Sequence, residues 1–84
     1  MRKASPEVKR VILEAVKDQI ESNNPPATKQ TYERLLSENI TEEDAYIYLG
    51  QALISEMFVM MKEKRQYDED NYVKLLSQLP HLFD

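Results

Sequence analysis

The sequence predicts an all-α fold, a small bundle of four helices. Apolar residues recur at three- and four-residue steps over most of the chain, and no stretch alternates between apolar and polar residues as a half-buried strand does. One glycine, a Pro-Pro pair and a series of cap residues divide the chain into helical segments at about 5–22, 25–38, 41–64 and 68–79. The 84 residues suit a single helical domain, residues 1–84.

Prolines define the starts of the first two predicted helices. In the first, Ser5 is the N-cap and Pro6 takes the first helical position, where a missing N–H costs nothing. The segment SNNPP ends this helix, because a residue that precedes proline is pushed out of the α region. We expect Asn24 to cap the second helix, with both prolines in its first turn.

Polar caps define the starts of the other two helices. Thr41 is the predicted N-cap of the third, with Asp44 at N3 in a variant of the capping box. Tyr67, Asp68 and Tyr72 fall at N′, N-cap and N4 of the fourth, which is the spacing of a hydrophobic staple. The sequence therefore indicates a well-defined start for each of these helices.

The second and fourth helices share a sequence echo. TYERLLS at 31–37 and NYVKLLS at 71–77 have the same Tyr, basic residue, Leu-Leu and Ser at an offset of forty residues. Such a period suits a repeated helix pair. The same residues are also what any amphipathic helix needs, so both interpretations stay open.

The third predicted helix is apolar around most of its circumference, which indicates a central position in the bundle. Its most apolar side contains Ala45, Leu49, Ala52, Leu53, Met57 and Met60. Glu56 falls in the middle of that side. An unpaired buried carboxylate costs several kcal/mol or takes up a proton. We therefore predict a structural polar cluster of Glu56 with Arg34 or the hydroxyls of Tyr32 and Tyr72; the alternative is a group that faces a ligand or a partner.

Motif spacing argues against several classes of function. The seventeen residues 45–61 are shorter than the roughly 20 that a membrane span requires, and they include polar side chains. With no cysteine and one histidine, the chain lacks the ligand sets of di-iron and thiolate sites, and we expect no metal and no cofactor. No Gly-rich phosphate loop or nucleophile elbow occurs, so we expect no catalytic residues and no enzyme.

The charge distribution argues against nucleic acid as a partner. The net charge is −4, and residues 41–84 carry four Lys/Arg against nine Asp/Glu. Phosphate binding needs clustered cations. A weaker hypothesis remains, in which the first helix, together with Lys3, Lys9 and Arg10, contacts nucleic acid. The absence of cysteine favours a reducing cytoplasmic location.

An excess of apolar side chains predicts an interface. Some of them flank the polar strip of the third helix and others lie on the tail after Pro80; the candidate residues are Ile47, Tyr48, Phe58, Val59, Leu82 and Phe83. Contiguous exposed apolar surface usually marks a protein contact, and a two-fold homodimer is its commonest form. The alternative is a monomer in which the tail folds back over this surface.

Several of these features together resemble a known group. The outline is Pro-Pro, Thr-Tyr-x-Arg-Leu, an Ala after an acidic cap, a Glu inside the apolar helix, Asp-x-x-x-Tyr and Leu-Pro. It is carried by Pro25, Pro26, Thr31, Tyr32, Arg34, Leu35, Ala45, Glu56, Asp68, Tyr72, Leu79 and Pro80. This outline resembles a group of small bacterial all-helical proteins of unknown function and covers about two thirds of the chain. The resemblance implies a helical fold and assigns no activity.

The sequence thus predicts a small cytoplasmic helical protein that serves as a protein–protein interaction or structural module. Its partner would be another protein or a second copy. The alternative is a small-ligand-binding or regulatory domain with a pocket around Glu56.

Overall fold

The computed structural model describes residues 6–83, within which it has four α-helices and no strand. The helices are α1 (Pro6–Ser22), α2 (Pro26–Ser37), α3 (Glu42–Glu63) and α4 (Glu69–Ser77). The all-α prediction is confirmed. The predicted Ser5 cap and Lys3 lie outside the described residues. The fourth helix ends at Ser77, two residues earlier than expected, and turns carry the chain to Pro80.

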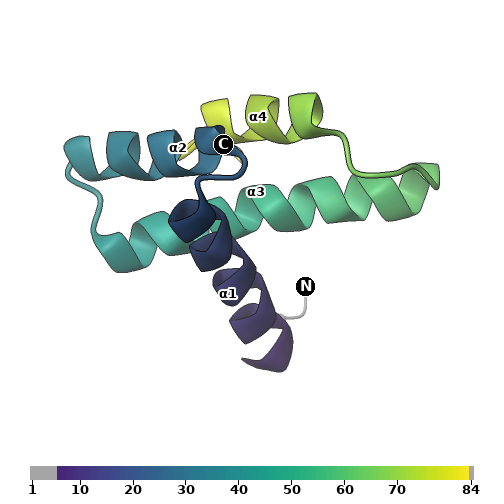
Figure 1. The fold of residues 1–84 in the computed structure, drawn as a ribbon, viewed down its shortest axis with the longest axis horizontal. Coiled ribbons are helices and arrows are strands. Elements are labelled where there is room, and N and C mark those ends of the chain that lie inside the picture. The colour runs from purple at the N-terminus through teal and green to yellow at the C-terminus, as the bar shows by residue number, and fades with distance from the viewer. Residues whose placement is uncertain (1–5, 84) are drawn as a thin grey trace.

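Helix α3 is the centre of the bundle, as its sequence indicated. Helices α1, α2 and α4 all pack against it, and α2 and α4 also contact each other. In Figure 1, α2 and α4 run along one side of α3, while α1 crosses α3 and projects beyond it. The arrangement leaves part of α3 without a helix over it, toward its C-terminal end.

The polar caps of α3 and α4 form as predicted. The Thr41 hydroxyl accepts a hydrogen bond from the Asp44 N–H at 3.1 Å, and the Asp68 carboxylate accepts one from the Asn71 N–H at 3.2 Å. The rings of Tyr67 and Tyr72 lie 6.0 Å apart between centroids, as a hydrophobic staple requires. Both helix starts are therefore fixed locally by the sequence.

The cap of α2 was predicted wrongly. Pro25, not Asn24, is the N-cap, with φ −74° and ψ 150° and no side-chain cap hydrogen bond. Pro26 is the reason, because a proline holds the residue before it in the extended region. The helix accordingly starts one residue later than the sequence suggested.

The core is built on one side of α3. Ten apolar residues form a buried cluster: Ile12, Val16, Leu35, Ala45, Leu49, Ala52, Leu53, Tyr72, Leu76 and Leu79. Met57 and Met60 were expected on this buried side, but Met57 is 43% exposed and Met60 is only half-buried. A helical wheel shows direction around α3 but not how far the covering helices extend along it. The fully buried part of α3 ends at Glu56.

The echo between α2 and α4 does not correspond to equivalent packing. The buried residues of α2 are Thr28, Thr31 and Leu35, while those of α4 are Tyr72 and Leu76. At an offset of forty residues, the buried Thr31 and Leu35 align with positions 71 and 75, whereas the buried residues of α4 are Tyr72 and Leu76. The buried positions thus differ by one residue, which is about 100° around a helix. The two helices therefore bury different faces, as expected for two amphipathic helices and not for a repeated unit.

Gly50 does not separate two helices, because it lies inside α3 at the point where α1 crosses. A Cβ atom built on Gly50 would lie 3.2 Å from Ile12 Cγ2 and 3.9 Å from Leu13 Cδ2. The missing side chain lets the two helices approach closely at this position. The crossing of α1 over α3 depends on this contact.

We predict that Gly50→Leu lowers the free energy of unfolding by about 2 kcal/mol, because the added side chain overpacks the crossing. Gly50→Ala should stay within about 1 kcal/mol of the wild type, since better helix propensity offsets the tight Ile12 contact. Urea unfolding followed by far-UV circular dichroism measures both. A leucine variant as stable as the wild type would contradict the close crossing.

Candidate functional site

Glu56 is fully buried, and protein donors surround both of its carboxylate oxygens. Arg65 donates from Nη1 to Oε2 at 2.8 Å and from Nη2 to Oε1 at 2.9 Å. The two residues form a bidentate, charge-assisted ion pair. The Asp68 N–H donates to Oε2 at 2.9 Å, and Asn71 Nδ2 donates to Oε1 at 2.7 Å. Each oxygen thus accepts two hydrogen bonds, so the carboxylate is satisfied entirely within the fold.

Local structure after α3 brings these donors to Glu56. Lys64 adopts the left-handed conformation with φ 52° and ends α3, so the chain reverses direction and Arg65 points back toward the helix. Asp68 is the N-cap of α4 and Asn71 lies in its first turn, where free N–H groups and the helix dipole favour a negative charge. The carboxylate therefore joins α3, the connecting loop and the start of α4.

The Arg65 contact is the main cause of a low pKa at Glu56. Arg65, the Asp68 N–H and Asn71 favour the ionised form more strongly than burial opposes it, and the pKa of Glu56 falls from 4.5 to about 2. The same pair raises the pKa of Arg65. Glu56 is consequently a stable anion at neutral pH.

The predicted partners of Glu56 were wrong, although its burial and its structural satisfaction agree with the prediction. Arg34 Nη2 donates to the carbonyls of Leu76 and Leu79, at 3.3 and 2.9 Å, and Nη1 pairs with Glu38 at 2.8 Å. Arg34 thus caps the C-terminal end of α4, where free carbonyls attract a cation. The distance along α4 keeps it from reaching Glu56 at the opposite end.

The two tyrosines predicted beside Glu56 bond elsewhere. The Tyr32 hydroxyl donates to Glu42 at 2.8 Å, and desolvation together with that carboxylate raises the pKa of Tyr32 to about 12. The buried Tyr72 hydroxyl donates to Gln19 Oε1 at 2.8 Å, and burial raises its pKa. Thr28 donates to the same Gln19 oxygen at 2.8 Å. Gln19 therefore links α1, α2 and α4.

Arg65 and Asn71 are the residues that sequence reasoning missed at this site. Both follow Glu56 in the chain, at separations of nine and fifteen residues. The available signal was the predicted Asp68 cap, because a helix start offers N–H donors to a nearby carboxylate. The sequence did not show that this helix start lies beside Glu56, because it does not give the direction of the loop between α3 and α4.

The predicted interface residues separate into covered and exposed groups. Tyr48 and Leu82 are partly buried and pack against the core cluster, so only part of each side chain is open to a partner. Ile47 and Val59 are half-buried. Phe58 remains 65% exposed, so the tail does not cover it, and Phe83 is 69% exposed.

A different apolar surface is exposed where α1 leaves α3, and we call it the apolar corner. It consists of Val8 and Val11 on α1 and Ile54, Met57, Phe58 and Met61 on α3. The α3 residues follow i, i+3, i+4, i+7 spacing and so make one stripe. A surface hollow of about 350 Å³ that Val8, Val11 and Met57 help to line joins the two helices. The corner is one continuous apolar surface.

Two further observations concern membranes and metals. Among the described helices, none is both long enough and apolar enough to cross a membrane. Within residues 6–83, no group of three or more His, Cys, Asp or Glu side chains is arranged to hold a metal ion.

We predict that Glu56→Ala lowers the free energy of unfolding by about 3 to 5 kcal/mol, because it removes the buried partner of Arg65 and leaves two other donors without an acceptor. Glu56→Gln should cost less, about 2 kcal/mol, since the amide oxygen keeps an acceptor. Glu63→Gln is the matched control: Glu63 also contacts Arg65, at 3.3 Å, but is exposed, so its loss should cost less than about 0.5 kcal/mol. Equal stabilities for all three variants would contradict a structural role for Glu56.

Acid should remove the contribution of Glu56. Its pKa is lower in the folded chain than the ordinary 4.5, so the ionised group stabilises the fold fully above pH 4.5, and this stability is lost as pH falls toward about 2. The stability difference between the wild type and Glu56→Gln should therefore shrink over that range. Urea unfolding of both proteins at a series of pH values measures it, and a constant difference would show that the pKa of Glu56 is not lowered.

Comparisons of the chain with protein-family models, curated proteins and solved structures find no match. The resemblance to small bacterial helical proteins stays a prediction. Any function must therefore be argued from the geometry of the chain itself, in which the carboxylate cluster stabilises the fold and the apolar corner faces outward.

Proposed function

We propose that this chain is a cytoplasmic protein–protein interaction module without catalytic activity, and that it self-associates through the apolar corner. The observation that carries the proposal is the exposed stripe on α3, where Phe58 and Met61 are 65% and 77% exposed. Neighbouring Val8 and Val11 extend this surface onto α1. Contiguous apolar surface of this kind on a small domain is typical of an interface.

The hydrogen bonds already made by the Glu56 carboxylate favour an interaction role over ligand binding. A pocket around Glu56 would need a free acceptor, but four protein donors already occupy its two oxygens. Replacing them with a ligand would break the pair with Arg65 and the link to α4. The geometry therefore favours the apolar corner over Glu56 as the functional surface.

The shape of the corner fits a second copy of the same helix. The part of α1 from Pro6 to Val11 projects past the crossing near Ile12, as Figure 1 shows for the start of α1. Six residues of α-helix extend about 9 Å, and packed helices lie about 8 to 10 Å apart. Two α3 stripes could thus pack antiparallel, with the start of each α1 beside the partner's α3.

The charges at the two ends of the corner are complementary under this arrangement. Glu7 helps to line the hollow on α1, while Lys62 lies on the last turn of α3. A two-fold axis between the α3 stripes would bring the start of one α1 toward the end of the other α3. Glu7 of one copy would then approach Lys62 of the other, and the same patch serves both subunits.

We predict that the protein forms a dimer in sedimentation equilibrium and that Phe58→Asp shifts it to the monomer, because a charge would be buried among apolar side chains. An increase of about tenfold or more in the dissociation constant is expected. Val73→Asp is the matched control, since Val73 is an exposed apolar residue on α4 outside the corner. It should leave the dimer intact.

A single monomeric mass at high concentration for the wild type would overturn self-association. Dimers that tolerate Phe58→Asp but dissociate with Phe83→Asp would place the interface at the C-terminal tail instead. Circular dichroism of each variant confirms that the fold persists, because all three positions are solvent-exposed.

A further inference from the structure

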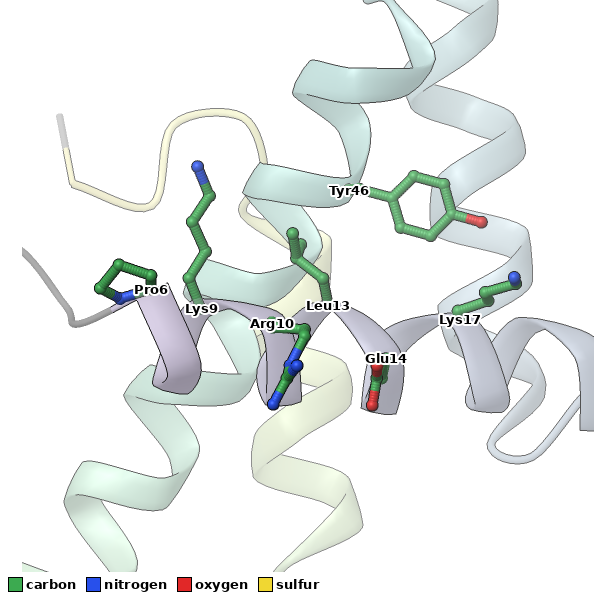
Figure 2. Close-up of a pocket in the computed structure, with 7 residues that line it drawn as sticks. All are labelled: Pro6, Lys9, Arg10, Leu13, Glu14, Lys17 and Tyr46. Carbon is green, nitrogen blue, oxygen red and sulfur yellow. The ribbon is translucent and has the colours of Figure 1, made fainter.

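A second surface hollow lies along another side of α1, and we call it the basic groove. It has a volume of about 410 Å³ and a largely apolar lining that includes Pro6, Leu13 and Tyr46. Its other lining residues are Lys9, Arg10, Glu14 and Lys17. Figure 2 shows Leu13 between Lys9 and Lys17 along α1, with Tyr46 of α3 on the same side. The groove thus combines an apolar floor with cations at both ends.

The cations of the groove are available for a partner. No ion pair joins Lys9, Arg10 or Lys17 to another residue in the described part of the chain. Three cations against the single acid Glu14 give the groove a net positive charge on a chain whose net charge is −4. Charge of the opposite sign to the rest of the protein attracts an anionic group to this place.

We propose that the basic groove binds an acidic amphipathic helix of a partner protein. Lys9 and Lys17 are eight residues apart, which is about 12 Å along α1. A partner helix lying along α1 would present two carboxylates at the same separation, seven or eight residues apart, to these lysines. Apolar side chains between the carboxylates would contact Leu13 and Tyr46. This is the helix-in-groove mode of recognition, with charges that set the register.

The surroundings favour a short acidic helix over nucleic acid. Glu42, Glu43 and Asp44 lie in the first turn of α3, two to four residues before Tyr46. A continuous phosphate backbone that passed the groove would meet these carboxylates, whereas a helix with two acids can end before them. The apolar floor also offers nothing to a phosphate, but it can bury leucine-sized side chains.

The basic groove and the valines of the apolar corner lie on different sides of α1, although Ile54 of the corner shares a smaller hollow with Lys9 and Leu13. On the α1 wheel, Val8 and Val11 point away from the side that carries Lys9, Leu13 and Lys17. The inference therefore does not depend on self-association. Phe58→Asp, which should disrupt the corner, should leave binding at the groove unchanged.

The test uses a fluorescent synthetic helix with two glutamates about eight residues apart and leucines between them, titrated with the full chain and read by fluorescence anisotropy. We expect Lys9→Glu combined with Lys17→Glu to raise the dissociation constant at least tenfold. A peptide with lysines in place of the two glutamates should regain binding to that double variant. Lys29→Glu, an exposed cation on α2, should change binding less than about twofold.

Three outcomes would overturn the proposal. The first is equal affinity for the acidic peptide and for one with glutamines in place of its two glutamates. The second is unchanged binding after the double charge reversal. The third is tighter binding of a DNA oligonucleotide than of the peptide at matched salt, with a steep salt dependence, which would assign the groove to nucleic acid instead.

Discussion

The pair between Glu56 and Arg65 is the interaction on which the packing of α4 depends. A nine-residue helix has little stability of its own, so α4 must be fixed by contacts with the rest of the chain. Glu56 supplies them at its start, through the Asp68 N–H and the Asn71 amide. Because Arg65 lies in the loop between α3 and α4, the same carboxylate also fixes the direction of that loop. Tyr72 and Leu76 can reach the core only when this connection holds.

Two further polar contacts hold the C-terminal end and the middle of α4 against other helices. Arg34 holds its C-terminal carbonyls from α2, and Gln19 holds the Tyr72 hydroxyl from α1. The helix is thus attached at both ends and at its centre, each time by a partner from another element. These contacts keep α4 on the side of α3 that carries Glu56. The stripe from Ile54 to Met61 lies on another side of α3 and remains open.

The sequence predicted the features that depend on neighbouring residues, such as helix caps. It did not predict the contacts that depend on the path of the chain in space. Thr41 and Asp68 were identified as caps because the cap and its N–H partner are three residues apart. The burial of Glu56 followed from its position among apolar residues, but its partners depended on where the loop after Lys64 turned. Met57 was expected on the buried side of α3 and is 43% exposed for a related reason: a wheel gives the side of a helix, whereas exposure depends on how far each neighbour extends along it.

Helix α1 separates the two surfaces to which we assign partners. One side of it borders the apolar corner, and another side borders the basic groove. A dimer that formed through the corner and left both grooves open would carry two binding sites for an acidic helix. Two grooves in one assembly would bind a partner with two acidic helices more tightly than either groove alone, because the second contact becomes intramolecular. Under these proposals, self-association strengthens recognition without changing any contact within a groove. The close crossing at Gly50 holds α1 in the position that makes this possible.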